Sequence, residues 1–253
     1  MLHHYRSASG AHAQRRLSRR FLATAAAGAV VASGIAMAAP AMAASAPSSG
    51  CAAVNLIVTR ASTEAQGEGI TGNLASAIVS ASTQTVSVEA TTYPASLNNY
   101  ASSESQGVTA IESELSKAES SCPDQKQVLL GYSQGAQASL DTITGNGEVS
   151  GGTAGKATAA ELSKVVAIAV FGDPGHVTKQ PWDLGTSTTN GIFPRNSSED
   201  SAIASFAGGT KIAAWCDAND EFCSSGNSLQ VHLTYLNRYQ TAAEDFVLNL
   251  IGG

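Results

Sequence analysis

Charged side chains are scarce in this sequence, and the small residues Ser, Thr, Ala and Gly are abundant instead. This composition is typical of many secreted proteins. The sequence also lacks an internal repeat and a heptad pattern, which argues against solenoid and coiled-coil architectures. It has no linker long enough to separate two domains. We therefore expect a single folded domain.

Acidic residues are absent from residues 1–43, whereas five arginines occur there. An Ala/Gly-rich apolar run extends from Phe21 to Ala39, and Ala41-Met42-Ala43 is an A-x-A cleavage signal. The stretch Ser18-Arg19-Arg20-Phe21-Leu22 resembles a twin-arginine export signal. The alternative is an uncleaved membrane anchor, since the run is long enough to span a bilayer. Its many Ala and Gly residues favour a cleaved signal peptide.

Cleavage after Ala43 would leave 210 residues, of which 44–50 form a flexible lead-in and 51–253 a single domain. Nine basic residues would then face 20 acidic ones, which is a formal net charge of −11. So acidic a surface argues against nucleic acid and anionic membranes as partners. We expect a secreted monomer with no stable membrane association after cleavage.

Only four cysteines occur, and none has the C-x-x-C spacing of a zinc site. An even number in an exported chain predicts two disulfides, for which three pairings exist. Cys216 and Cys223 are close enough to close a local loop, which leaves Cys51 to pair with Cys122. Thiol redox chemistry at Cys216 and Cys223 is the alternative, but the six residues between them suit a structural clip.

Apolar runs alternate with helical patterns along the chain. Continuous runs with β-branched residues are typical of parallel strands covered on both faces. The alternation predicts a three-layer α/β/α sandwich with a central parallel five-stranded sheet, whose reactive site lies at the carboxyl ends of the strands. The expected strands are 54–59, 86–91, 128–131, 165–171 and 211–215, and the expected helices are 73–82, 108–120, 134–143 and 234–250.

The pentapeptide Gly131-Tyr132-Ser133-Gln134-Gly135 lies between an expected strand and an expected helix. This is the setting that a G-x-S-x-G nucleophile elbow requires, because the serine sits on a sharp, strained turn. Glycine at the flanking positions lets strand and helix pack closely. We therefore predict that Ser133 is a nucleophile.

A serine hydroxyl needs a base, which at neutral pH is normally histidine. Only His176 and His232 occur after residue 43. Hydrolases with this elbow have the chain order Ser, acidic residue, His. His232 lies in an expected loop before the last helix and fits that order, so we predict that it is the base. His176 directly follows a strand end and is interpreted as a surface or cap residue.

An acidic residue must orient the base. Asp220 lies inside the loop that Cys216 and Cys223 would close, where a disulfide would preorganise a carboxylate. Asp217 lies in the same loop and is its main rival. Asp173, followed by a proline, is interpreted as a turn cap.

The oxyanion of the transition state needs backbone donors. The N–H of Gln134, next to Ser133 at a helix N-terminus, is the first candidate. A second donor is expected from the loop after the first strand, Arg60-Ala61-Ser62-Thr63-Glu64. From the residues alone, that loop is only a polar turn.

Six motifs together resemble the cutinases and the related acetylxylan esterases over nearly all of residues 51–250. They are Arg60-Ala61-Ser62-Thr63-Glu64, Tyr93-Pro94-Ala95, Gly131-Tyr132-Ser133-Gln134-Gly135-Ala136, Phe171-Gly172-Asp173-Pro174, Cys216-Asp217-Ala218-Asn219-Asp220-Glu221-Phe222-Cys223 and Val231-His232-Leu233.

The resemblance implies a small, lidless α/β hydrolase with Ser133, His232 and Asp220 as its triad. It places Ser62 and Gln134 in the oxyanion hole, and it pairs Cys51–Cys122 and Cys216–Cys223. Many cutinases have glycine where this chain has Ala61. No metal or cofactor is implied.

We expect a secreted serine ester hydrolase of cutin-like or short- to medium-chain acyl esters. The alternative is deacetylation of acetylated xylan, because Gly191-Ile192-Phe193-Pro194-Arg195 looks closer to the acetylxylan esterases. The presence of only two disulfides is instead typical of cutinases. The rim between Asp220 and His232 mixes apolar and polar residues. A more distant alternative is a non-catalytic binding protein on the same fold.

Overall fold

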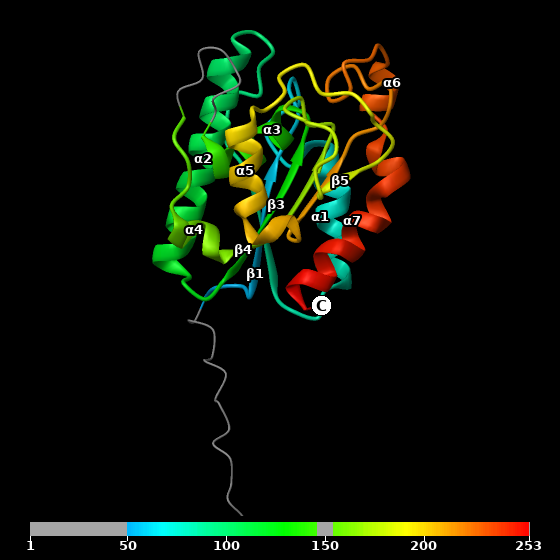
Figure 1. Cartoon of the computed structure of the whole chain (residues 1–253). Helices are drawn as coiled ribbons and strands as arrows, with labels where there is room; N and C mark the ends of the chain where they lie inside the picture. Colours follow the sequence, from blue (N-terminus) through cyan, green and yellow to red (C-terminus); the bar gives the residue numbers. More distant parts are fainter. Residues whose placement is uncertain (1–49, 146–153, 253) are drawn as a thin grey trace, which may run out of the picture. The chain divides into compact units, whose positions relative to one another are not determined.

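A parallel six-stranded sheet forms the centre of the fold, with the strands in the order β2-β1-β3-β4-β6-β5 (Figure 1). The computed structural model describes residues 50–145 and 154–252, so the predicted signal peptide and residues 44–49 of the lead-in lie outside it. The strands are β1 (Val54–Thr59), β2 (Val86–Ala90), β3 (Lys126–Tyr132), β4 (Val165–Phe171), β5 (Asp183–Leu184) and β6 (Ile212–Trp215).

The prediction of a parallel α/β sandwich is confirmed, because every strand pairs in parallel with its neighbours. The predicted number of five strands is wrong by one. The additional strand, β5, has only two residues and pairs with β6 at the edge of the sheet. So short a strand carries no periodic hydrophobic pattern that a sequence could reveal.

Helices cover both faces of the sheet, with α1 and α7 on one side and α2, α3, α4 and α5 on the other (Figure 1). Short 3₁₀ turns occur at Gly69–Thr71 and Ala207–Gly209. The helices are α1 (Gly72–Ala81), α2 (Tyr100–Ser121), α3 (Gln134–Thr144), α4 (Ala159–Lys164), α5 (Ser197–Ser205), α6 (Leu229–His232) and α7 (Tyr235–Ile251).

Strand β4 shows why the chain forms two hydrophobic cores. Its side chains alternate between the faces, as those of a strand must. Ala169 and Phe171 contact the core under α1 and α7, whereas Ile168 and Val170 contact the core under α2, α3 and α5. All four are fully buried. The residues of β4 therefore form a continuous apolar run in the sequence.

Helix α2 begins eight residues before the predicted position of 108. Its first turns bury Ser103, Glu104 and Ser105, so they show no apolar face. The Oγ atoms of Ser103 and Ser105 are satisfied by hydrogen bonds, to Gln134 Oε1 at 2.9 Å and to Ala101 O at 2.8 Å. Buried polar groups with partners are tolerated, but they conceal the helical pattern in the sequence.

Helices α4 and α5 were not predicted, although each begins with a capping box. Thr158 Oγ1 accepts a hydrogen bond from Glu161 N, and Asn196 caps α5 in the same way with Glu199. This S/T/N-x-x-E pattern is a signal of a helix start. Both helices are short, and their apolar residues are too few to produce a marked periodicity.

Two disulfides connect the four cysteines. Cys51 and Cys122 join the residues before β1 to the end of α2, and Cys216 and Cys223 close a loop after β6.

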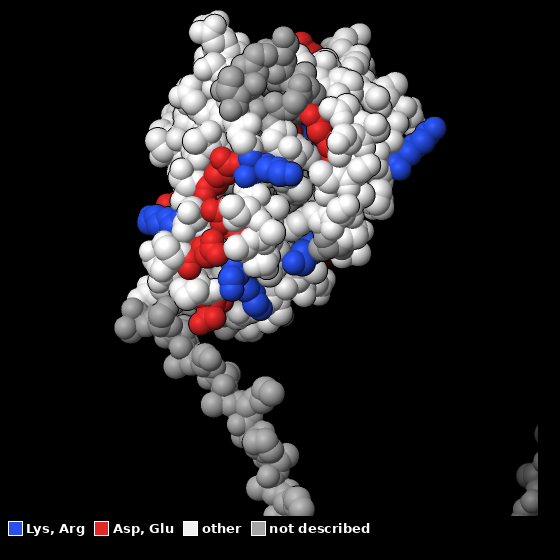
Figure 2. Space-filling model, turned by 60° about the vertical axis from the view of Figure 1, so that its left-hand side comes forward, with Lys and Arg blue, Asp and Glu red and all other residues white. Residues whose placement is uncertain are grey.

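Charged residues are sparse on the surface that Figure 2 shows, where acidic and basic side chains lie among many uncharged ones. Among the described residues, no helix combines the length and hydrophobicity needed to cross a bilayer.

Candidate active site

Ser133 occupies a single-residue turn between β3 and α3. Its φ of 55° and ψ of −120° lie in a region that only glycine adopts without cost. Its N–H donates to Phe171 O at 2.8 Å, which ties the turn to the end of β4. Ser133 is 8% exposed. The turn thus holds a hydroxyl near the surface at the carboxyl end of the sheet.

The close packing of strand and helix around this turn depends on Gly135. A Cβ atom there would lie 2.1 Å from Thr59 O and 2.5 Å from Arg60 O, at the end of β1. Neither carbonyl can move without disturbing the end of β1 or the loop that follows it. Glycine is therefore the residue that allows α3 to begin directly against the ends of β3 and β1.

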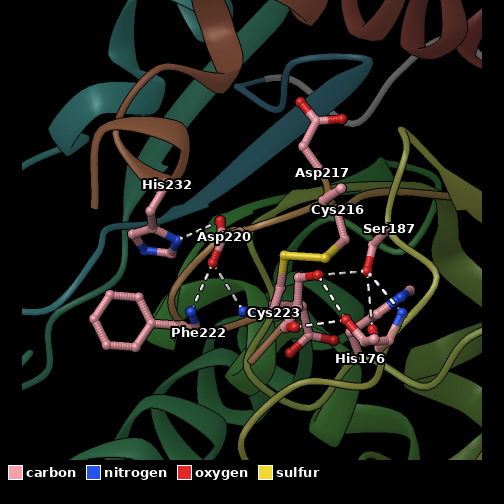
Figure 3. The surroundings of a disulfide bond; sticks show 12 residues. His176, Ser187, Cys216, Asp217, Asp220, Phe222, Cys223 and His232 are labelled. Carbon is pink, nitrogen blue, oxygen red and sulfur yellow. Dashed lines mark hydrogen bonds and ion pairs between the residues drawn. A yellow bond between two sulfur atoms is a disulfide. The ribbon is translucent and has the colours of Figure 1, made fainter. Parts of the chain in front are cut away.

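His232 and Asp220 form a buried pair. His232 Nδ1 lies 2.8 Å from Asp220 Oδ2, and the two residues are 3% and 0% exposed (Figure 3). Asp220 Oδ1 accepts hydrogen bonds from the N–H groups of Phe222 and Cys223, at 2.7 and 2.9 Å. Burial alone would raise the pKa of Asp220, but the hydrogen bond and charge of His232 and these two N–H groups lower it below its ordinary value. The carboxylate is therefore held ionised.

Contacts from β3 and β4 place His232 beside the elbow. The Tyr132 hydroxyl donates to the carbonyl oxygen of His232, and the two rings lie 5.7 Å apart. A Cβ on Gly172 would approach His232 Cε1 to 2.8 Å. We predicted that His232 lies in a loop, and this is wrong. His232 is the last residue of the one-turn helix α6, which Ser228 caps. With Nδ1 engaged by Asp220, Nε2 is the nitrogen left to serve the serine. The hydrogen bonds of the described residues do not include one between Ser133 Oγ and this nitrogen, a contact that often tightens only with substrate.

Asp217, the other candidate carboxylate in the same loop, is bound by residues other than His232. Its Oδ2 accepts from Arg238 Nε at 2.8 Å, and its Oδ1 accepts from the Tyr239 hydroxyl at 2.8 Å and from Thr186. Figure 3 shows Asp217 apart from His232, whereas Asp220 lies against it. Of the two carboxylates, the structure brings only Asp220 to the imidazole.

The loop after β1 is built around a buried arginine and a partly buried glutamate. The Arg60 guanidinium donates to Thr91 O and Tyr93 O at 3.2 and 2.6 Å. Glu64 Oε2 accepts from Ala61 N at 2.7 Å. The hydroxyl of Ser62 is buried and has no hydrogen-bond partner among the described residues. A buried donor without a partner is costly, and it suits a site where a ligand oxygen arrives.

Gln134 opens α3, and the first N–H groups of a helix have no partner within it. Its side chain is fixed by two contacts: Ser103 Oγ donates to its Oε1 at 2.9 Å, and its Nε2 donates to Ser96 O at 3.1 Å. The Gln134 N–H is therefore held at a helix N-terminus next to Ser133, where a developing negative charge would be stabilised.

His176 is not at the surface, contrary to our interpretation. It is 5% exposed, and its Nδ1 lies 3.6 Å from Asp183 Oδ1. Burial lowers its pKa. In Figure 3 the Cys216–Cys223 disulfide lies between His176 and His232. Asp173 does shape a turn, since its Oδ1 accepts from Gly175 N at 2.8 Å.

A buried arginine, whose contacts the sequence did not reveal, links segments that lie far apart in the chain. Arg195 is 5% exposed and lies 2.6 Å from Asp141 Oδ1 and 2.5 Å from Asp173 Oδ2. These contacts join α3 and the turn after β4 to the loop that precedes α5. The partners are far apart in the sequence, so no local motif signals them.

A parallel α/β sheet with a strained serine after a central strand, beside a buried His–Asp pair, defines the class of α/β hydrolases. The cutinase family model matches residues 50–251. The chain therefore belongs to the cutinase family.

Known relatives agree with this assignment. The chain is 34% identical over 207 residues to an acetylxylan esterase of Hypocrea jecorina, covering 78% of this chain and 67% of the relative. It is 31% identical to Cutinase 11 of Verticillium dahliae, covering 78% and 68%. The structure matches the catalytic core domain of an acetyl xylan esterase from Trichoderma reesei with a TM-score of 0.70 and 30% identity, covering 79% and 99%. The chain is a carboxylic ester hydrolase.

Proposed function

We propose that Ser133, His232 and Asp220 are the catalytic triad of this esterase. The observation that supports the proposal most directly is the buried His232–Asp220 pair at 2.8 Å, beside a serine held at φ 55°. The N–H of Gln134 and the unpartnered hydroxyl of Ser62, with its N–H, form the oxyanion hole in this proposal. Each group thus has one chemical role.

The reaction follows from these roles. His232 Nε2 takes the proton of Ser133 Oγ, which attacks the ester carbonyl carbon and forms a tetrahedral oxyanion. The imidazolium then gives its proton to the alcohol oxygen, and the C–O bond breaks to leave an acyl-enzyme. Water, deprotonated by the same imidazole, attacks the acyl carbon. The bond from this carbon to Ser133 Oγ then breaks, the acid leaves, and the imidazolium returns its proton to Ser133 Oγ. Asp220 stabilises the imidazolium in both halves.

We propose that the substrates are cutin-like or short- to medium-chain acyl esters. Leu229 and Leu233, at the two ends of α6, are 49% and 50% exposed on either side of His232 in the sequence. The Phe222 ring contacts the imidazole with centroids 4.6 Å apart. Exposed apolar side chains around the base favour substrates with an apolar acyl part.

Deacetylation of xylan is the second candidate. The relative at 34% identity and the structure at 30% identity are both acetylxylan esterases. The rim between Asp220 and His232 also carries exposed polar side chains, among them Ser225 and Asn227. A polar rim suits a sugar backbone.

The acyl preference separates the two candidates. We expect activity on p-nitrophenyl esters from acetyl to dodecanoyl to peak at butyryl or longer, with weak acetate release from acetylated xylan. Purified protein beginning near Ala44 is the material, and initial rates at equal enzyme concentration are the measurement. Strong acetate release, with a collapse of activity beyond the shortest acyl chains, would instead establish the acetylxylan type.

We also propose that the chain is exported and cleaved after Ala43. The two disulfides support this, because such bonds persist in oxidising compartments. Expression with the native leader is expected to yield a fragment that begins near Ala44 in the culture medium, as read by N-terminal sequencing. Full-length protein confined to membranes would contradict cleavage.

A further inference from the structure

The hydroxyl of Tyr235 contacts the buried carboxylate of Asp220. It lies 2.9 Å from Asp220 Oδ2, 2.7 Å from Asp217 N and 3.2 Å from Cys223 Sγ. The Asp217 N–H is a donor, so the hydroxyl must accept from it. The sulfur of a disulfide is a weak acceptor. The single hydroxyl proton of Tyr235 is therefore donated to Asp220.

Asp220 Oδ2 is thus shared between two donors. His232 Nδ1 approaches it at 2.8 Å and the Tyr235 hydroxyl at 2.9 Å. The other oxygen, Oδ1, is held by two backbone N–H groups. The carboxylate therefore accepts four hydrogen bonds, and three of its four donors belong to groups other than the base.

The Tyr235 ring is too tightly packed to move away. It is fully buried at the first residue of α7. The rings of Tyr132, Phe171 and Tyr239 lie 6.0, 6.3 and 6.3 Å from it, centroid to centroid. Burial, followed by the charge of Asp220, raises the pKa of Tyr235 well above its ordinary value. The hydroxyl consequently stays protonated, and so remains a donor, at any pH at which the enzyme works.

We propose that Tyr235 is a positioning residue for the triad. Its hydroxyl fixes Asp220 Oδ2 in front of His232 Nδ1. It also draws part of the carboxylate's negative charge to itself and so limits how strongly Asp220 holds a proton on the imidazole. The inference rests on the proposed function, because it matters to catalysis only if His232 is the base.

Among the described residues, the other charged or titratable groups packed near His232 have partners of their own. Tyr132, from β3, donates to its carbonyl oxygen. On the side of α7, Asp217 is paired with Arg238 at 2.8 Å. From the end of β4, Asp173 is paired with Arg195. Asp220 and Tyr235 are therefore the groups through which a change in the imidazole titration is expected to act.

Tyr235→Phe removes the hydroxyl and keeps the ring. The undivided charge of Asp220 then favours the imidazolium, so the midpoint of the His232 titration and the acid limb of the pH–rate profile should both move up by about half a pH unit. We expect kcat on a p-nitrophenyl ester to fall about tenfold, because the carboxylate is less well oriented. KM should not change, since a fully buried hydroxyl does not touch substrate.

The titration midpoint is measured by NMR of the ring nitrogens, with His232→Gln used for assignment, and the kinetic constants are measured across the pH range. Tyr239→Phe is the matched control, because its hydroxyl binds Asp217 Oδ1 on the same helix and loop. The control should leave both midpoints at the wild-type value. An unchanged midpoint in Tyr235→Phe would overturn the inference.

Replacement of Tyr235 by 3-fluorotyrosine covers the case in which the phenylalanine variant does not fold. The fluorinated ring keeps its packing, and its more acidic hydroxyl is a stronger donor. We therefore expect the titration midpoint to move down, opposite in sign to Tyr235→Phe. No shift, or an upward shift, would sink the proposal. The NMR readout does not depend on turnover, so failure of the wild type to hydrolyse esters would count against the proposed function alone.

Discussion

Ser133→Ala is expected to lower kcat on the best p-nitrophenyl ester by on the order of 10⁶-fold. The substitution removes the attacking oxygen and keeps the backbone turn. His232 then has no serine proton to accept, so it can no longer stabilise the transition state as a general base. Binding should be nearly unaffected, and the thermal midpoint should stay within about 2 °C of the wild type, since the change removes one atom near the surface.

The measurement combines steady-state kinetics with labelling by a phosphonate ester. Mass spectrometry should find the label on Ser133 in the wild type and none in the variant. Ser139→Ala is the matched control, because Ser139 lies on α3 and its Oγ donates only to Gly135 O, at 2.7 Å. Persistent turnover in Ser133→Ala would show that another group is the nucleophile. A serine in the folded wild type that the phosphonate does not label would favour a binding protein.

Asp220→Asn is expected to lower kcat by on the order of 10⁴-fold. Asp220 Oδ1 receives two backbone N–H groups, so the carbonyl oxygen of the asparagine should take that place. The amide NH₂ then faces His232 Nδ1 and donates to it. The imidazole is forced into the tautomer with its proton on Nε2, where it cannot accept the proton of Ser133.

Asp217→Asn is the control for this change, because it alters the neighbouring carboxylate of the same disulfide loop. Asp217 binds Arg238 and Tyr239 and does not contact His232. We expect its kcat to stay within about threefold of the wild type, with some loss of thermal stability from the weakened ion pair. If Asp217→Asn lost as much activity as Asp220→Asn, the assignment of the orienting carboxylate would be wrong.

Strand β4 could be predicted because burial on both faces makes it apolar throughout. Residues 165–171 match β4 at both ends. Predictions failed where structure depends on polar groups with distant partners. The first turns of α2 bury Ser103, which bonds to Gln134 of α3, and β5 exists only because its two residues pair with β6. Such partners cannot be read from the local sequence.

The sequence by itself determined which residue types were available for catalysis: an elbow serine, one histidine in the expected chain order and two aspartates in one cysteine-closed loop. Only the tertiary structure decided which aspartate meets the imidazole. Arg238 and Tyr239 of α7 hold Asp217, while two backbone N–H groups and Tyr235 hold Asp220 against His232. Two carboxylates three residues apart look alike in a sequence. What separates them is the direction in which each points, and that direction is set by partners on another element.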